Sequence, residues 1–314
     1  MEKDARIYVA GHKGLVGSAI VRNLQDRGFH HLVCRTHDEL DLTDYQKVGE
    51  FFQSENIDYV FLAAAKVGGI LANSQYPAEF IKENLMIEIN VIDWSYKTGV
   101  RKLLFLGSTC IYPRMAEQPI RESELLNGTL EPTNEAYALA KITGIKMCES
   151  YNKQYGTNYI SVMPTNLYGP NDNYNQVTSH VLPALVRKFY DAKRSGDPYV
   201  TVWGTGRPKR EFLHSDDLAD ACIYLMDHYD GPDIVNIGVG KELTIRELAE
   251  RIKKIIGYTG EIRFDTSKPD GTPRKMIDVS KLNDLGWKAT ISLDQGLERT
   301  YREFLLNLNE IVDR

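Results

Sequence analysis

At Gly11-His12-Lys13-Gly14-Leu15-Val16-Gly17, glycines at every third position separate an apolar run at 6–10 from an amphipathic segment at 15–27. Glycine lets the backbone turn tightly and approach a pyrophosphate, whose negative charge is favoured at the N-terminal end of the following helix. An ordinary tight connection between a strand and a helix would also accommodate these glycines. Because the turn stands within an alternation of strands and helices, we predict that it binds a dinucleotide.

Outward from this turn, residues 1–165 alternate short β-branched or aromatic runs with longer amphipathic segments, which is typical of a parallel sheet covered by helices. The expected strands lie at 6–10, 31–35, 58–64, 102–107 and 158–163, and the expected helices at 15–27, 44–54, 77–98 and 134–155. We therefore predict an α/β fold, with a Rossmann-type doubly wound parallel sheet at 1–170. The looser pattern of 171–314 predicts a smaller mixed α/β lobe that binds substrate, and the chain can cross back between the two domains.

The second expected strand ends at Cys34-Arg35-Thr36, where an NAD-dependent enzyme commonly has an acidic residue for the ribose hydroxyls. Arg35 takes that place here, and Lys13 adds a second cation from the glycine turn. Two solvated surface charges are the alternative explanation. Cations in place of a carboxylate favour a 2′-phosphate, so we predict that the 1–170 domain binds NADP.

Ser108 follows the fourth expected strand, and Tyr137 and Lys141 stand four residues apart on the last expected helix. Side chains at this spacing share one helix face, so we expect the Lys141 ammonium to lower the pKa of Tyr137. Such a tyrosine can protonate a carbonyl oxygen as hydride reaches its carbon, with the Ser108 hydroxyl as a second donor. Tyrosine and lysine at this spacing are common by chance, and the glycine turn together with Ser108 favours the catalytic interpretation.

The composition is that of a globular protein with a slight acidic excess. Lys plus Arg total 38 against 43 for Asp plus Glu, a net charge of -5 that argues against a nucleic-acid or anionic-membrane partner. The longest apolar run, 59–65, is far shorter than the roughly 20 residues of a membrane span, and we expect no secretory signal. Scattered cysteines without metal-ligand spacing predict a reducing cytoplasm and no bound metal: Cys34, Cys110, Cys148 and Cys222.

The glycine turn, Ser108, Tyr137 and Lys141 resemble the extended short-chain dehydrogenase/reductase superfamily, whose members mostly act on sugar nucleotides. Within it, the chain is most similar to the GDP-L-fucose synthase family, over essentially its whole length. One departure is Lys13, where the family pattern has an arginine, so a cation is kept but its bidentate geometry is lost. The matching motifs are Ala63-Ala64-Ala65-Lys66-Val67-Gly68-Gly69-Ile70, Gly107-Ser108-Thr109-Cys110-Ile111-Tyr112-Pro113, Leu130-Glu131-Pro132-Thr133-Asn134-Glu135, Met163-Pro164-Thr165-Asn166-Leu167-Tyr168-Gly169-Pro170, Arg210-Glu211-Phe212-Leu213-His214 and Lys268-Pro269-Asp270-Gly271-Thr272-Pro273-Arg274-Lys275.

This resemblance implies a bifunctional enzyme that inverts C3 and C5 of GDP-4-keto-6-deoxy-D-mannose and reduces C4 with NADPH to give GDP-L-fucose. It implies that Cys110 is a base and His180 an acid, although such residues are more often a buried small hydrophobe and a packed or solvated histidine. The implied catalytic residues are Ser108, Cys110, Tyr137, Lys141 and His180. The implied cofactor contacts are Gly11, His12, Lys13, Gly14, Leu15, Val16, Gly17, Arg35, Asp41, Leu42, Ala64, Tyr137, Lys141, Pro164 and His180. The implied substrate contacts, each of which could instead be ordinary surface, are Asn166, Lys188, Trp203, Arg210 and Lys275.

Similar enzymes also imply a homodimer in which segments 77–98 and 134–155 pair as a four-helix bundle, although both segments could be covered within one chain. Two other functions stay open. A 4-epimerase or 4,6-dehydratase with tightly held NAD is disfavoured by Arg35 and by the Cys110 and His180 pair. A non-catalytic NADP-sensing protein would not need Tyr137 and Lys141 together.

Overall fold

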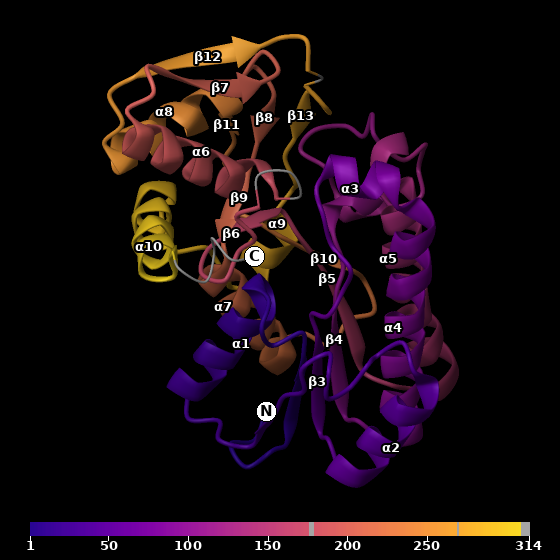
Figure 1. Cartoon of the computed structure of the whole chain (residues 1–314). Helices are drawn as coiled ribbons and strands as arrows, with labels where there is room; N and C mark the ends of the chain where they lie inside the picture. The colour runs from indigo at the N-terminus through magenta and orange to yellow at the C-terminus, as the bar shows by residue number, and fades with distance from the viewer. Residues whose placement is uncertain (176–178, 269, 309–314) are drawn as a thin grey trace.

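The computed structural model of this chain describes residues 1–175, 179–268 and 270–308. Its centre is a six-stranded parallel sheet in the order β10-β5-β4-β3-β1-β2 (Figure 1), so the predicted Rossmann-type α/β fold is confirmed. The strands are β1 (Ile7–Ala10), β2 (Leu32–Val33), β3 (Tyr59–Leu62), β4 (Lys102–Leu106), β5 (Tyr159–Pro164) and β10 (Val235–Ile237).

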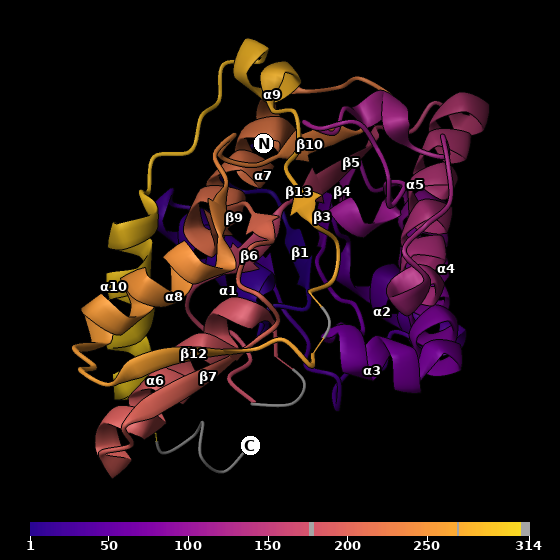
Figure 2. The ribbon, with the colours of Figure 1, turned by 90° about the horizontal axis from the view of Figure 1, so that it is seen from above.

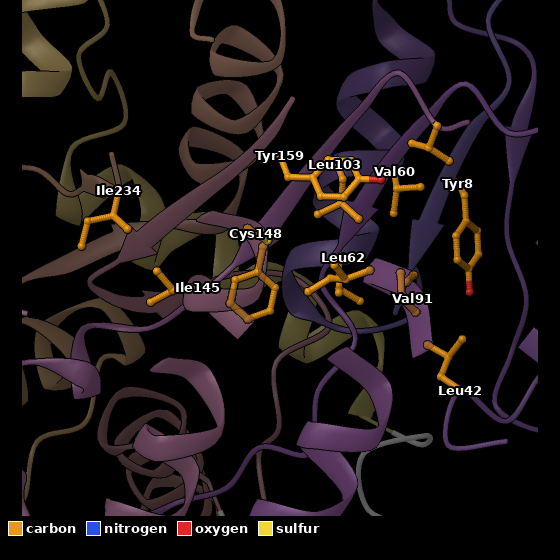
Figure 3. Packing of buried hydrophobic residues seen from close by; sticks show 14 of the residues in the cluster. Tyr8, Leu42, Val60, Leu62, Val91, Leu103, Ile145, Cys148, Tyr159 and Ile234 are labelled. Atoms are coloured by element: carbon orange, nitrogen blue, oxygen red, sulfur yellow. The ribbon is translucent and has the colours of Figure 1, made fainter. Parts of the chain in front are cut away.

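Helices cover both faces of this sheet, which explains why its strands are almost continuously apolar. Side chains of β1 alternate between the two faces: Tyr8 and Ala10 join one hydrophobic core, whereas Ile7 and Val9 join the other. The first core lies under α2 (Tyr45–Glu55), α4 (Pro77–Lys97) and α5 (Glu135–Tyr155), and Figure 3 shows Val91 of α4 and Ile145 of α5 within it. The second lies under α1 (Leu15–Asp26) and α7 (Ser215–His228).

Local sequence signals set the helix ends near the predicted positions. The 3-10 helix Pro132–Asn134 leads into α5, and Gly156 ends α5 with a φ of +70°, where glycine avoids the strain that other residues meet. The predicted strand at 31–35 is too long, since only Leu32 and Val33 pair with β1. Arg35 therefore lies beyond the edge strand of the sheet.

The second lobe contains small sheets and three helices that share a core of their own (Figure 2). Its helices are α6 (Val181–Ser195), α8 (Ile245–Ile256) and α10 (Leu293–Leu306). Two of its sheets have two strands each: β7 (Tyr199–Trp203) pairs with β12 (Glu261–Asp265), and β6 (Asn166–Tyr168) pairs with β9 (Phe212–His214). In the third sheet, β8 (Lys209–Arg210) lies between β11 (Leu243–Thr244) and β13 (Arg274–Lys275). The short helices α3 (Ile70–Gln75) and α9 (Ser280–Asp284) and the 3-10 helices Thr109–Ile111 and Glu122–Glu124 complete the described elements.

The chain crosses between the two lobes more than once. After β9, helix α7 packs beside α1 and β10 joins β5 at the edge of the large sheet, before the chain returns to the second lobe at β11. Within the described ranges, no helix combines the length and apolarity that crossing a membrane requires.

Candidate active site

The glycine turn lies where the connections of the sheet change direction, because β1 pairs with β2 on one side and with β3 on the other. Gly11 has a φ of +82°, and a Cβ there would lie 2.8 Å from the backbone N and Cα of Ala64, just after β3. A Cβ on Gly17 would lie 2.1 Å from the carbonyl oxygen of Gly11. The backbone is thus packed as only glycine allows, at the place where open α/β sheets bind ligands.

The N-terminal end of α1 is available to an anion. Gly14 is its N-cap residue and provides no side-chain cap, and no acidic residue occupies the first turn. The first N–H groups of α1 and the helix dipole therefore fit the pyrophosphate of a dinucleotide. His12 is half-buried and Lys13 is exposed; burial lowers the pKa of His12, and the nearby Lys13 charge lowers it further.

Arg35 is held beside the edge of the sheet. Its guanidinium pairs with the Glu55 carboxylate and donates to the carbonyl oxygen of Cys34 at 2.9 Å. It also lies 5.5 Å from the centre of the Phe51 ring. Glu55 is shared with Arg6, so two arginines flank one carboxylate and the Arg35 side chain keeps 36% of its surface exposed.

Three other residues that the family resemblance assigns to the cofactor are held by hydrogen bonds or packing within the protein. Asp41 accepts hydrogen bonds from the N–H of Thr43 at 2.9 Å and its hydroxyl at 2.7 Å. Leu42 is buried in the core in Figure 3, and its carbonyl oxygen accepts from Asn90 of α4 at 2.8 Å. Pro164 is the buried last residue of β5. Asp41 and Leu42 thus shape the turn that leads into α2.

Tyr137 and Lys141 lie close together on α5, with the ammonium nitrogen 5.8 Å from the centre of the tyrosine ring. Lys141 is only 2% exposed. Its Nζ lies 3.1 Å from Oε1 of Glu88 on α4 and donates to the carbonyl oxygen of Leu106 at 3.1 Å. It also lies 4.7 Å from the Phe105 ring centre, so the ammonium is fixed between α4, α5 and the end of β4.

The predicted lowering of the Tyr137 pKa is wrong. Burial raises the pKa of Tyr137 well above its usual value, and repulsion from the Glu88 carboxylate and from Cys110, where its thiol is ionised, adds to this effect. The positive charge of Lys141 is already opposed by the Glu88 carboxylate, which the sequence pattern did not reveal. Tyr137 therefore stays protonated at neutral pH, which suits a proton donor rather than a base.

Ser108 and Cys110 follow directly after β4. Ser108 is the N-cap of the 3-10 helix Thr109–Ile111, and its hydroxyl oxygen accepts from the N–H of Cys110 at 3.3 Å. Burial raises the pKa of the Cys110 thiol, while the charge of Lys275, the Ser108 hydroxyl and the charge of Lys141 oppose that rise. The thiol needs these partners, or a change on substrate binding, to become a base.

Lys275 is electrostatically coupled to both the predicted base and the predicted acid. It lies on β13, in register with Arg210 of β8, and burial lowers its pKa. His180 is the N-cap of α6; desolvation by the surrounding protein lowers its pKa, and Lys275 lowers it further. Because Lys275 also favours the Cys110 thiolate, this cation links the two groups.

Lys188 and Trp203 meet on the second lobe. The Lys188 ammonium lies 5.0 Å from the Trp203 ring centre and donates to the carbonyl oxygen of Thr201 at 3.3 Å. Lys268 lies 5.6 Å from the same ring, and Trp203 is 55% exposed. A pocket of about 270 Å³ borders Lys188 and Trp203. An exposed aromatic face between two cations fits a planar, anionic ligand such as a nucleotide.

Glu211, which stands in a matching family motif but was assigned no role from the sequence, connects the strands that carry the substrate residues. Its carbonyl oxygen accepts from Asn166 Nδ2 at 2.8 Å. Its buried carboxylate accepts from the N–H groups of Gly240 at 2.7 Å and Ile277 at 3.3 Å. These bonds hold β13 beside the strand of Arg210.

Glu88 was also missed, although the sequence contains a signal for it. It is one helical turn from the buried residues Asn84 and Ile92, so it lies on the inward face of α4. A carboxylate on such a face requires a buried partner. Identifying that partner as Lys141 requires the packing of α4 against α5.

A family model, the NAD dependent epimerase/dehydratase family, matches residues 7–238. Over 308 residues, the chain is 61% identical to "Putative GDP-L-fucose synthase 2" of Arabidopsis thaliana, covering 98% of this chain and 94% of that protein. It is 58% identical to "GDP-L-fucose synthase" of Escherichia coli (strain K12), covering 96% of this chain and 97% of that protein.

Among solved structures, "MlghC, GDP-mannoheptose C4 reductase from Campylobacter jejuni with NADP bound" is 44% identical, with a TM-score of 0.91. The superposition covers 97% of this chain and 99% of that one. The glycine turn, the strand-end serine and the tyrosine and lysine of α5 thus occur in a chain that matches its relatives over nearly its full length. The chain belongs to the NAD dependent epimerase/dehydratase family and, within it, to the GDP-L-fucose synthases.

Proposed function

We propose that this chain is a bifunctional 3,5-epimerase and NADPH-dependent 4-reductase that converts GDP-4-keto-6-deoxy-D-mannose to GDP-L-fucose. The observation that carries the proposal is the group formed by Tyr137, Lys141, Ser108 and Cys110 at the end of β4 and on α5. It combines two hydroxyl donors for a carbonyl oxygen with a thiol that can act beside that carbonyl. The names of the family relatives support the substrate.

In the reduction, Tyr137 donates its phenolic proton to the C4 oxygen of the sugar. Ser108 donates a second hydrogen bond to that oxygen and stabilises the charge that develops on it. The Lys141 ammonium, fixed close to the ring, stabilises the phenolate that remains. Bound NADPH supplies the hydride that C4 receives.

In the epimerisations, a proton leaves the carbon beside the C4 ketone and another returns on the opposite face. We assign removal to the Cys110 thiolate, which Lys275 favours, and return to His180. Ser108 and Tyr137 stabilise the enolate oxygen as they stabilise the alkoxide, so one pair of donors serves every step.

For the cofactor, we assign the pyrophosphate to the uncapped end of α1 and to the glycine turn between Gly11 and Gly17. Lys13 and Arg35 then hold the 2′-phosphate of NADPH. For the substrate, Arg210 and Lys275 meet the diphosphate, while Lys188 and Trp203 face the nucleoside and Asn166 contacts the sugar. We therefore assign the cofactor mainly to the domain of the large sheet and the GDP-sugar mainly to the second lobe.

An activity assay tests this function. The chain is incubated with NADPH and a panel of 4-keto sugar nucleotides, and the loss of NADPH absorbance is followed. We expect oxidation with GDP-4-keto-6-deoxy-D-mannose and formation of GDP-L-fucose. Turnover of a sugar nucleotide without net NADPH consumption would instead identify a 4-epimerase or dehydratase, and binding without turnover would identify a sensor.

Arg35→Gln should weaken NADPH binding by about 10- to 100-fold, because one charge-assisted hydrogen bond to phosphate contributes about 1.5–3 kcal/mol. NADH affinity should change little, since NADH lacks the 2′-phosphate. The matched control is Arg6→Gln, which removes the other arginine that pairs with Glu55. Fluorescence titration with both cofactors measures the effect; an equal loss for NADPH and NADH would assign Arg35 a structural role.

A homodimer built on α4 and α5 follows from their exposed apolar residues. Ile89 and Tyr96 lie on one face of α4, 41% and 37% exposed, and Leu139 of α5 is 42% exposed. The two helices pack side by side at one edge of the molecule (Figure 1), so a second copy can cover them. Light scattering should give about twice the 35.7 kDa chain mass.

Leu139→Arg should shift this dimer toward the monomer, because it places a charge in the apolar contact. Met115 is 84% exposed and lies outside α4 and α5, so Met115→Arg is the control that should leave the dimer intact. A wild-type chain that scatters as a monomer at micromolar concentration would refute the dimer. We also propose a cytoplasmic location, which the four free cysteines support.

A further inference from the structure

Glu88 and Lys141 form a buried ion pair that the reduction described above does not use. The Glu88 side chain is 1% exposed, and its Oε1 lies 3.1 Å from the Lys141 nitrogen. Among the described residues, this ion pair is the one polar contact recorded for the Glu88 carboxylate. The carboxylate therefore acts on the molecule chiefly through Lys141.

The packing around the pair leaves little freedom. Oε2 of Glu88 lies against Gly144, where an added Cβ would be only 2.8 Å from that oxygen. The same Cβ would lie 2.4 Å from the Phe105 ring, and Lys141 rests over that ring. Glycine at 144 thus makes room for a carboxylate that reaches across from α4 to α5.

Stability alone is a poor reason for this arrangement. Removing two charges from water has a large desolvation cost, and apolar side chains of similar volume often pack as well or better. Burial in fact raises the pKa of Glu88 to about 7, with Lys141 offsetting only part of the rise. A carboxylate kept here at such a cost acts on its neighbours: it pairs with Lys141, and its charge contributes to the raised pKa of Tyr137.

We propose that Glu88 is a positioning residue for the proton transfer of the reduction: it holds the Lys141 ammonium beside Tyr137, and its negative charge helps Tyr137 to keep the proton that it donates. This inference rests on the proposed reductase function. Glu88 itself does not touch the reacting atoms.

The sign of the effect follows from electrostatics. A negative charge next to a group that holds a proton makes it harder for that group to lose the proton. Glu88 acts on Tyr137 in this direction. Without the Glu88 charge, Tyr137 loses its proton at a lower pH, and a tyrosine that has lost its proton can no longer protonate the C4 oxygen. Removing the charge should therefore shift the alkaline loss of reductase activity to lower pH.

The other ionisable groups near this pair are few, and they do not reverse this sign. Cys110, from the 3-10 helix after β4, and Cys148, from α5, are both thiols whose pKa values are raised by burial, so they are neutral at neutral pH. Phe105 and Leu106, on β4, contribute a ring face and a carbonyl oxygen. Above about pH 7, Glu88 therefore places a negative charge near Tyr137 and Lys141, and Cys110 adds a second one, of the same sign, where its thiol ionises.

The test measures kcat for NADPH oxidation with GDP-4-keto-6-deoxy-D-mannose from about pH 6 to about pH 11 in wild type and Glu88→Gln. We expect the alkaline half-point of Glu88→Gln to fall by about one pH unit or more, the usual effect of one nearby charge. The Kd for NADPH should stay within about twofold of wild type. A change in kcat without a change in NADPH affinity would show that Glu88 acts on the reaction step and not on cofactor binding.

The matched control is Asp93→Asn. Asp93 is also a carboxylate of α4 that bonds to α5, through the Tyr151 hydroxyl at 2.8 Å, but it pairs with Lys97 instead of Lys141. Asp93→Asn should leave the pH dependence as in wild type. An equal shift in both variants would assign the effect to helix packing and overturn the proposal, as would a Glu88→Gln profile that coincides with wild type.

Glu88→Asp keeps the charge but shortens the side chain, so its alkaline half-point should stay near wild type while kcat falls several-fold. If Glu88→Gln does not fold, Glu88→Asp decides alone: a lower kcat at unchanged NADPH affinity supports positioning, and a wild-type kcat overturns it. A wild-type chain that oxidises no NADPH with the keto sugar would overturn the proposed function and this inference together. An active wild-type chain with an unshifted Glu88→Gln variant overturns the inference alone.

Discussion

Replacing Tyr137 by phenylalanine is expected to slow reduction of the C4 ketone by about 10²- to 10⁴-fold, the usual contribution of a positioned acid. The ring keeps its edge-to-face contact with Phe80, so packing is preserved and only the phenolic proton is lost. NADPH affinity should change little. Stopped-flow measurement of NADPH oxidation at saturating substrate, with fluorescence titration of NADPH, separates the two effects.

Tyr112→Phe is the control for that loss. The Tyr112 hydroxyl is buried and donates to Asn236 at 2.6 Å, so its removal should lower the melting temperature without a specific loss of reduction. If Tyr137→Phe oxidises NADPH at a rate near that of wild type, the assignment of Tyr137 and Lys141 to catalysis is wrong. A loss of the same size in both variants would point to a general disturbance of the fold.

Cys110→Ser should abolish deuterium incorporation at C3 and C5 while leaving hydride transfer possible. A hydroxyl ionises far less readily than a thiol, so the side chain keeps its approximate size but no longer acts as a base. Mass spectrometry of GDP-4-keto-6-deoxy-D-mannose incubated with enzyme in D₂O measures the exchange. Loss of exchange is the largest change we expect for the epimerase steps.

Two further variants sharpen this test. Cys148→Ser changes a thiol that is buried in the α5 core, and it should exchange deuterium at the wild-type rate. His180→Asn should permit some exchange but impair inversion, because the proton removed from one face is no longer supplied from the other. Full exchange by Cys110→Ser would exclude Cys110 from the mechanism and show that another group removes the protons at C3 and C5.

The fold could be predicted largely because its signals are local. Each strand of the large sheet in the first half is an apolar run next to an amphipathic helix, and glycine or capping residues mark the boundaries. The end of β2 could not be predicted in this way. Cys34 and Arg35 continue the β-like composition, but the ladder with β1 stops at Val33, a limit set by tertiary pairing.

The same difference between local signals and tertiary contacts decides which features of the candidate site could be predicted. Spacing on one helix was enough to associate Tyr137 with Lys141, since i and i+4 positions are neighbours in every α-helix. The charge that acts on them was not predictable, because Glu88 comes from another helix and its effect depends on how α4 packs against α5. The predicted direction of the Tyr137 pKa shift was wrong chiefly because burial raises that pKa, with the Glu88 charge adding to the rise, even though Tyr137 and Lys141 do lie close together. Coupling of Lys275 to Cys110 likewise depends on contacts between segments distant in sequence.

The return of α7 and β10 to the large sheet matters for how the chain is made. On the ribosome, β5 emerges before its neighbour β10, and α1 emerges long before α7 covers it. Until about residue 237 has left the exit tunnel, the nascent chain carries an unpaired strand edge and an uncovered apolar helix, both of which promote aggregation. The cofactor domain thus completes its folding late in synthesis. A fragment that ends at residue 170 lacks both α7, which covers α1, and β10, which pairs with β5.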